Sequence, residues 1–329
     1  MGTTPRHIQI LLAAGLVALL LFPLVAERFY IQLLTKVMTT AIFALSLDLL
    51  VGYTGLVSFG HAAFYGLGGY ALAIAERDLG LTALWTTLPL ALVVSALAGL
   101  IIGWVSIRTS GIFFIMITLA FAQMLFFFFH DSPWFQGSDG MFINIRPTVS
   151  IAGLEIVDLD RRGERYYFVL FWLVATYLFL ATILKAPFGQ VITGIRANET
   201  RMRALGYATD RYKLTSFVIG GMLAGLAGYL YGMQDGFIAP EAMHWRHSGT
   251  ILVTVILGGM GTLTGPIIGA FVMVLLEDWL AALTDRWLLI MGIFVIAVVL
   301  LLPNGIAGGL PKLKGRARTP PPAEEAADA

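Results

Sequence analysis

The sequence predicts an all-α polytopic membrane protein with about ten transmembrane helices, two of them broken at glycines. Of its 329 residues, 58% are hydrophobic and only 12% are charged, about half the charged fraction of a typical soluble domain. Crossing a hydrocarbon core takes about 20 predominantly apolar residues. Eight stretches of about that length or more lack Asp, Glu, Lys and Arg: 8–26, 49–75, 79–107, 109–130, 166–184, 214–234, 247–276 and 287–311. A ninth stretch, 29–47, is interrupted only by Lys36.

The first and seventh of these stretches need separate treatment. Segment 8–26 is longer than the apolar part of a usual signal peptide and leads into further spans, so it is interpreted as a first transmembrane helix. Stretch 247–276 contains "ILGGMGTLTGPIIG" (256–269), and Gly-Gly and Gly-Pro are strong helix breakers. We therefore expect a short helix before this break and a longer one, about 264–284, after it.

Basic residues predict which side of the membrane each connection faces. Lys and Arg cluster in 186–213 and in the tail, 311–329, and the positive-inside rule places both in the cytoplasm. Six crossings before the first cluster and four between the two make both termini cytoplasmic. Residues 1–310 then form one transmembrane domain, with a periplasmic loop at 131–165. The Pro- and Ala-rich tail is expected to be disordered.

Two glycine-rich segments resemble each other. "GYTGLVS" at 52–58 aligns with "GGMGTLT" at 258–264, as an internal repeat would. Non-helical backbone at membrane depth is tolerated where it is buried in protein or lines a wet cavity, and paired helix breaks point to a transport pathway. The predicted pathway residues are Gly52, Gly55, Ser58, Gly60, His61, Gly258, Gly261 and Gly265.

Helix packing is the alternative interpretation of these glycines. GxxxG spacing lets two helix backbones approach closely, and it is the favoured interpretation for Gly221, Gly225, Gly228 and Gly232, which lie on an unbroken span. His61, next to the first break, is either a structural histidine or a substrate contact.

The composition argues against several classes of function. The five histidines show no HExxH spacing, the chain has no cysteine, and no GxxxxGK[ST] motif is present. We therefore expect no catalytic residue, no metal, no cofactor, no nucleic-acid partner and no nucleotide bound by a P-loop of this chain. A proton-driven pump would need carboxylates near the middle of several spans, and that pattern is missing.

The segment 189–206 is predicted to form an amphipathic helix. Val191, Ile192, Ile195, Met202 and Leu205 share one face, opposite Arg196, Glu199 and Arg203, and Gly206 is well placed to end the helix. Glu199 and Arg203 have the spacing of an i,i+4 ion pair. Such a helix either lies on the membrane surface or inserts into a groove of a partner.

Several long motifs resemble one family. "GYTGLVSFGHAAFYGLGGY" (52–70), "QGSDGM" (136–141), "GIRANETRMRALGYATDRYKLTSFVIGGMLAGLAGYLYG" (194–232) and "VILGGMGTLTGPIIGA" (255–270) resemble LivM-type permeases of branched-chain amino acid ABC importers, over about residues 40–308. The resemblance implies import of leucine, isoleucine and valine across the bacterial inner membrane. It also implies three kinds of partner besides membrane lipid: a second, LivH-type permease, two ABC ATPase subunits and a periplasmic binding protein.

In that family a cytoplasmic helix couples the permease to the ATPase. The resemblance assigns this role to 190–206, with Ile195, Arg196, Glu199, Arg203, Ala204 and Gly206 as the coupling residues. Related permeases move urea or short amides, which leaves a second substrate class open. An ATP-independent secondary transporter or channel is the next alternative, and a membrane enzyme the third.

Overall fold

The computed structural model describes residues 6–151, 154–302 and 305–309, and in this part the chain is almost entirely α-helical. The helices are α1 (Arg6–Val25), α2 (Arg28–Asp48), α3 (His61–Arg77), α4 (Leu84–Ser106), α5 (Ile112–His130), α6 (Arg162–Lys185), α7 (Pro187–Ala197), α8 (Glu199–Ala204), α9 (Thr209–Asp235), α10 (Trp245–Gly258), α11 (Gly265–Leu283), α12 (Trp287–Leu301) and α13 (Gly305–Gly309). The strands are β1 (Met141–Phe142), β2 (Val149–Ile151), β3 (Leu154–Val157) and β4 (Phe237–Ile238).

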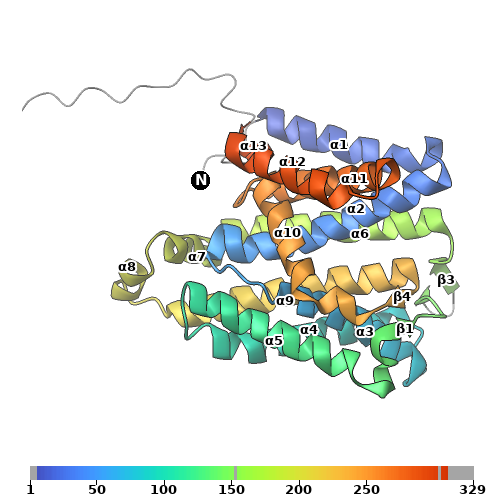
Figure 1. Cartoon of the computed structure of the whole chain (residues 1–329), viewed down its shortest axis with the longest axis horizontal. Coiled ribbons are helices and arrows are strands. Elements are labelled where there is room, and N and C mark those ends of the chain that lie inside the picture. Colours follow the sequence, from blue (N-terminus) through green and yellow to red (C-terminus); the bar gives the residue numbers. More distant parts are fainter. Residues whose placement is uncertain (1–5, 152–153, 303–304, 310–329) are drawn as a thin grey trace, which may run out of the picture.

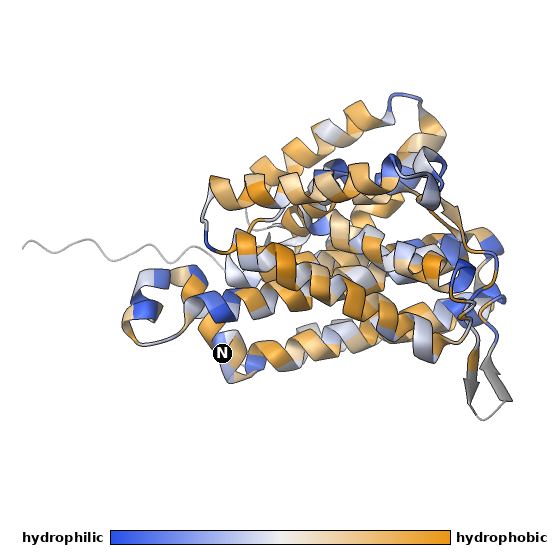
Figure 2. Ribbon diagram, turned by 90° about the horizontal axis from the view of Figure 1, so that it is seen from below, coloured by the Kyte–Doolittle hydropathy of each residue, from blue (hydrophilic) through white to orange (hydrophobic). Residues whose placement is uncertain are grey.

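Seven helical segments in the described part are long and apolar enough to cross a membrane. They are Arg28–Thr54, Leu84–Ser106, Ile112–His130, Arg162–Lys185, Thr209–Asp235, Gly265–Leu283 and Trp287–Gly308. The expectation of a helical polytopic protein is confirmed at this level, and the count of ten crossings stays a prediction. Most of the long helices run side by side along one direction (Figure 1), with apolar residues along their middle and hydrophilic residues toward both ends (Figure 2).

Helix α3 packs against α9 at backbone distance. A Cβ added to Gly68 on α3 would overlap the Gly225 carbonyl on α9, and one added to Gly228 would overlap the Tyr65 carbonyl. These glycines therefore let the two backbones touch, as the GxxxG spacing of Gly221 with Gly225 and of Gly228 with Gly232 predicted. The contact fixes α3 inside the bundle, where most of its residues are buried.

The two ends of the bundle differ. At one end α7 and α8 project beyond the long helices, and at the other lie the short strands (Figure 1). Strand β1 pairs antiparallel with β4 (Met141 opposite Ile238), and β2 pairs antiparallel with β3. The predicted external loop 131–165 thus contains strands β1 to β3. The predicted disordered tail, 311–329, lies outside the described residues.

The close packing of α9 against α4 leads to the first prediction. Leucine at Gly225 would collide with the Ser95 side chain on α4, and overpacking of this kind costs about 1–3 kcal/mol. We expect Gly225→Leu to lower the midpoint of thermal unfolding of the detergent-solubilised protein and to increase aggregation on size exclusion. Gly292→Leu on α12, where an added Cβ meets nothing within 4 Å, is the matched control. Equal stability of the two variants would contradict this packing.

Candidate functional site

The first glycine segment lies at the end of α2. The helix continues past Asp48 into a π-helical turn, Leu49–Thr54, which ends at Gly55 with a φ of +82°. A left-handed residue in this position costs glycine little and other residues more. Residues 55–60 are not helical, and α3 begins at His61. Gly52, expected within the break, lies inside the π-helical turn instead.

The second glycine segment packs directly against the first. Residues 259–264 connect α10 to α11, and Gly259 and Gly261 have positive φ values of +118° and +74°. The Gly261 N–H donates a hydrogen bond to Asp48 Oδ1 over 2.8 Å. A Cβ at Gly52 would overlap the Gly261 nitrogen, so the absence of a side chain at Gly52 allows this approach.

Asp48 is the buried charged group of this contact. Its residue is 1% exposed, and its second oxygen, Oδ2, has no hydrogen-bond partner among the described residues. A buried carboxylate needs charged or hydrogen-bonding partners to offset its lost hydration. The Gly261 N–H supplies one such partner, and this holds the 259–264 segment at the end of α2.

Arg196 joins α7 to the same place. Its Nη1 donates a hydrogen bond to the Gly52 carbonyl, and its side chain lies so close to Gly55 that an added Cβ there would sit 3.1 Å from Arg196 Cγ. A Cβ added to Gly261 would sit 3.0 Å from Arg196 Nη1. We call the set Asp48, Gly52, Gly55, Arg196 and Gly261 the glycine junction.

The glycine junction links three parts of the chain that are distant in sequence. The Gly52 carbonyl and the Gly261 N–H, the peptide groups expected to face a transport path, are both engaged in these internal hydrogen bonds. In this conformation the junction therefore holds α2, the 259–264 segment and α7 together. Breaking it would free one carbonyl, one amide and two charged side chains.

The other predicted pathway residues lie away from the junction. A Cβ at Gly60 would overlap the Thr118 carbonyl on α5, and Ser58, fully buried, accepts a hydrogen bond from the Gly60 N–H over 3.2 Å. Added Cβ atoms at Gly258 and Gly265 would overlap backbone atoms of their own α10–α11 connection. These positions therefore allow close packing.

His61 lies at the start of α3 in a buried aromatic cluster. Its ring Nε2 is 2.8 Å from Ser46 Oγ, and the ring stacks on Phe43 with centroids 5.6 Å apart. His247, on the first turn of α10, lies against the same Phe43, with centroids 5.3 Å apart. His61 Nδ1 and His247 Nε2 are buried and have no hydrogen-bond partner among the described residues.

Helices α3 and α10 begin side by side within this cluster. The Ala62 N–H, in the first turn of α3, donates to Ser248 Oγ, in the first turn of α10, over 2.8 Å. The first turns of helices carry N–H groups without intrahelical acceptors and a partial positive charge. Two such ends thus meet inside the bundle.

The prediction of a single helix over 189–206 is wrong, because the structure has two helices, α7 and α8, in this segment. Asn198, with φ −163° and ψ 99°, separates α7 from α8, and its side chain accepts the Arg201 N–H over 2.9 Å. Asparagine competes in this way with helix continuation. Of the predicted apolar face, Val191, Ile192 and Ile195 are buried on α7, whereas Leu205, just beyond α8, is 67% exposed.

Glu199 anchors α8 to the start of α9. Its Oε1 accepts hydrogen bonds from Lys213 Nζ and Arg203 Nη2, both over 2.8 Å, and from Thr209 Oγ1 over 3.2 Å. Burial acts to raise the pKa of Glu199, but the hydrogen bonds and charges of Lys213 and Arg203 outweigh it and hold the pKa below its usual range. The predicted Glu199–Arg203 pair is therefore present.

The predicted coupling residues point in two directions. Ile195 is buried against the bundle, and the side chain of Arg196, although exposed, reaches the Gly52 carbonyl. Ala204 and Gly206 are exposed at the tip, where Gly206 has a φ of +89°. Asp48 was not among the predicted site residues. The sequence contains one signal that could have identified Asp48. It is the only acidic residue between 28 and 75, and it lies four positions before Gly52.

The described residues contain no group of three or more His, Asp or Glu side chains that could hold a metal ion. The arrangement is therefore one of packing, hydrogen bonds and a projecting surface.

Comparison with known proteins identifies relatives over nearly the whole chain. The family model described as "Branched-chain amino acid transport system / permease component" matches residues 29–300. The LivM high-affinity branched-chain amino acid transport permeases of Salmonella typhimurium and Escherichia coli are 29% and 28% identical, over 93% of this chain and 76% of theirs. An autoinducer 2 import permease, LsrC, of Photorhabdus laumondii is 33% identical over 34% of this chain and 35% of its own. None of the solved structures gives a significant match.

The Glu199 network leads to the second prediction. We expect Glu199→Gln to speed amide hydrogen exchange of α8 at neutral pH roughly threefold, because a partly exposed ion pair contributes under about 1 kcal/mol. Since the pKa of Glu199 is lowered in the folded state, its stabilisation is present above the unfolded pKa and is lost as the pH falls through the folded pKa. The difference between wild type and variant, measured at matched pH, should therefore vanish in acid. A difference that persists in acid, or none at neutral pH, would contradict the assignment.

Proposed function

The chain belongs to the permease family of branched-chain amino acid transport systems, and from this premise we propose that it is the transmembrane permease subunit of an ABC importer. Its substrates would be leucine, isoleucine and valine, delivered by a periplasmic binding protein. ATP hydrolysis would reside on two separate ATPase subunits, and a second, LivH-type permease would complete the membrane part.

The single observation that carries the proposal is the path from α8 to the glycine junction. Around the tip of α8, Leu205 is 67% and Tyr207 41% exposed, so an apolar surface is free for a partner. Glu199 ties α8 to α9, and Arg196 ties the end of α7 to Gly52. An ATPase that moved α8 would thus pull on the junction, which supports residues 186–213 as the coupling loop.

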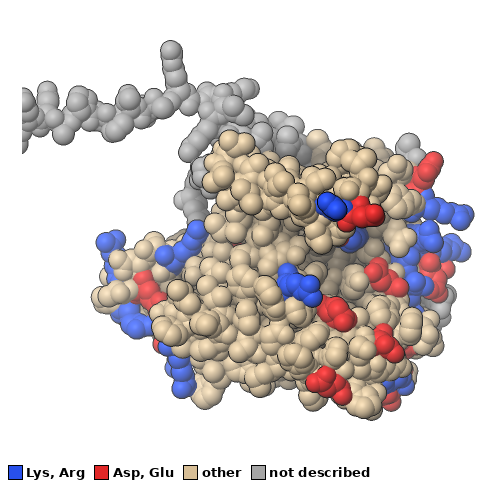
Figure 3. All heavy atoms as spheres, in the orientation of Figure 1, with Lys and Arg blue, Asp and Glu red and all other residues tan. Residues whose placement is uncertain are grey.

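The proposed orientation follows from the charges. Basic residues predominate around the α8 end, where acidic residues are also present, and both signs occur at the strand end, with mostly uncharged surface between (Figure 3). The positive-inside rule then favours a cytoplasmic α8 end and a periplasmic 131–165 loop in the bacterial inner membrane, with both termini cytoplasmic. Helices α1, α3 and α10, added to the seven candidate spans, would give the ten helices. The glycine breaks would then lie at 55–60 and 259–264, in a membrane domain of residues 1–310.

The transport path would run beside the glycine segments. A zwitterionic amino acid cannot cross bare hydrocarbon, because burying each charge costs several kcal/mol even after relaxation. Peptide groups released from the glycine junction, together with helix ends, would solvate it weakly. Weak solvation suits an importer, because the binding protein supplies affinity and the permease must release its substrate.

A charged pair on the side of the bundle supports a second permease subunit. Lys36 on α2 and Glu277 on α11 lie 3.8 Å apart, with side chains 48% and 38% exposed. Ionisable groups on a membrane span usually face protein or water, since exposure to lipid is costly. We propose that the partner permease covers this face and that the pathway runs between the two subunits.

Relatives leave the choice of substrate to experiment. The LivM proteins cover nearly the whole chain, whereas the LsrC protein, an autoinducer 2 import permease by name, covers about a third of it. Branched-chain amino acids are therefore the first choice. Urea or short amides, and ATP-independent transport, are the alternatives that an uptake assay separates.

The experiment combines uptake with a coupling variant. We expect the importer reconstituted in liposomes to take up leucine only with ATP, the ATPase subunits and the binding protein. Gly206→Leu should reduce leucine uptake per ATP hydrolysed roughly tenfold, within the usual range of coupling free energies, because leucine at a φ of +89° distorts the exposed turn that meets the ATPase.

Gly80→Leu is the matched control. Gly80 also has a positive φ, +61°, and also meets nothing within 4 Å of an added Cβ, but it follows α3 at the strand end. Its uptake per ATP should match wild type. Uptake of leucine without ATP would refute the importer, and normal coupling in Gly206→Leu would refute the role of the turn.

A further inference from the structure

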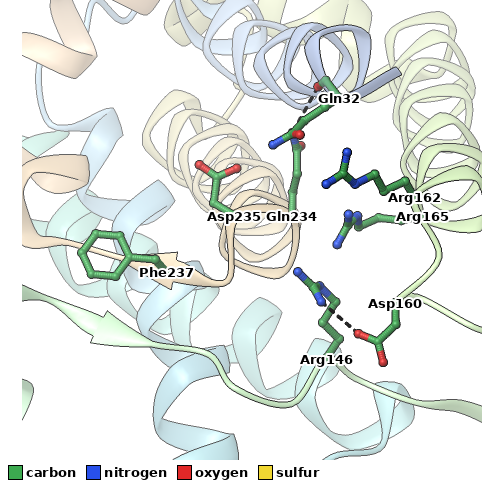
Figure 4. A pocket seen from close by; sticks show the side chains of 8 residues that line it. All are labelled: Gln32, Arg146, Asp160, Arg162, Arg165, Gln234, Asp235 and Phe237. Atoms are coloured by element: carbon green, nitrogen blue, oxygen red, sulfur yellow. Dashed lines mark hydrogen bonds and ion pairs between the residues drawn. The ribbon is translucent and has the colours of Figure 1, made fainter. Parts of the chain in front are cut away.

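A polar cavity opens at the strand end of the bundle, where α2 and α6 begin and α9 ends. It has a volume of about 520 Å³ and is lined by charged and amide side chains (Figure 4). Gln32 comes from α2, Arg162 and Arg165 from α6, and Gln234 and Asp235 from α9. Its volume lies in the range of small-molecule sites.

One wall of the cavity presents unpaired positive charge. Arg165 is only 7% exposed, and its Nη1 is buried with no hydrogen-bond partner among the described residues. Arg162 points into the cavity beside it (Figure 4). A third arginine, Arg146, already donates to Asp160 Oδ1 over 2.9 Å and to the Met233 carbonyl over 3.2 Å. A buried guanidinium with free N–H groups calls for an anionic acceptor.

The opposite wall presents acceptors for a cation. Asp235 is the last residue of α9, where the helix dipole is negative. Gln234 uses its Nε2 to donate to the Gln32 carbonyl over 3.3 Å, which leaves its Oε1 buried without a partner in the described part of the chain. Phe237 adds an apolar surface to the same cavity. Positive groups, negative groups and an aromatic ring therefore surround one space.

We propose that this cavity is an entrance site for an α-amino acid zwitterion. Its carboxylate accepts hydrogen bonds from Arg162 and Arg165, its ammonium donates to Asp235 and Gln234 Oε1, and its aliphatic side chain packs on Phe237. The inference rests on the proposed function, which places this end of the bundle on the side of the binding protein. A ligand carrying both charges would satisfy the buried polar atoms of both walls.

The test measures equilibrium binding to the complex of permease and ATPase subunits, without the binding protein and without ATP, in phosphatidylcholine nanodiscs by saturation-transfer NMR. The probes are leucine, leucinamide, which lacks the carboxylate, isocaproate, which lacks the ammonium group, and inorganic phosphate. Wild type should bind leucine more tightly than the other three. Arg165→Gln should weaken leucine at least about tenfold, since a charge-assisted hydrogen bond is lost, and should leave leucinamide unchanged.

Asp235→Asn should give the reverse pattern, with leucine weakened and isocaproate unchanged. Arg161→Gln, one position before α6 and paired with Asp158 and Glu164, is the matched control and should bind as wild type. Arg165→Lys, which keeps the charge, should recover part of the leucine binding, and this excludes a general loss of structure as the cause.

Three results would overturn the site. Unchanged leucine binding in both Arg165→Gln and Asp235→Asn would show that leucine does not bind in this cavity. Equal binding of phosphate and leucine would make it a general anion site, and loss of leucine binding in nanodiscs containing phosphatidylglycerol would make it a lipid headgroup site. Leucine uptake by wild type is measured separately, so normal uptake combined with any of these results refutes the site alone, while absent uptake refutes the proposed function.

Discussion

The structure depends on two polar side chains, the carboxyl group of Asp48 and the guanidinium group of Arg196, each of which bonds to backbone rather than to the other. The Asp48 carboxylate accepts the Gly261 N–H, and Arg196 donates to the Gly52 carbonyl. Both bonds require that Gly52 and Gly261 lack side chains, because an added Cβ at either position would press on the other segment's backbone. Hydrogen bonds to ionised groups are stronger than neutral ones, and burial of Asp48 raises the cost of leaving it unpaired. This contact sets where α2 ends, where α11 begins and where α7 meets the bundle.

The same contact links packing to the proposed transport path. The Gly261 N–H and the Gly52 carbonyl are held by Asp48 and Arg196 in this conformation, so the proposed path beside them would be closed by hydrogen bonds rather than by bulky side chains. Movement of α7 would break the bond to the Gly52 carbonyl directly, because Arg196 belongs to α7, whereas the Gly261 N–H is held by Asp48 of α2. In the proposed function, an ATPase docked on α8 would act on the glycine junction through this bond. The α3–α9 backbone contact holds these two helices close together.

Much of this fold follows from the sequence. Apolar stretches predicted the long helices, and Gly265 begins α11 close to the position expected from the Gly-Pro pair. The sequence could not reveal which glycines contact each other, because the contact between 52 and 261 depends on how distant segments pack. The division of the predicted 189–206 helix at Asn198 was missed because a side-chain cap competes locally with an otherwise good amphipathic pattern. The polar cavity was missed for another reason. Arg165 and Asp235 look like ordinary span-end charges until the bundle brings them together.

The measurement that tests this account most directly is the amount of substrate moved per ATP by Arg196→Ala in the reconstituted importer. Arg201→Ala, an exposed position on α8, is the control. If Arg196 links α7 to the glycine segments, Arg196→Ala hydrolyses ATP and assembles normally but moves roughly tenfold less substrate per ATP, within the usual range of coupling free energies, while Arg201→Ala behaves as wild type. A wild-type ratio in Arg196→Ala would contradict the account and would reduce the glycine junction to a packing contact.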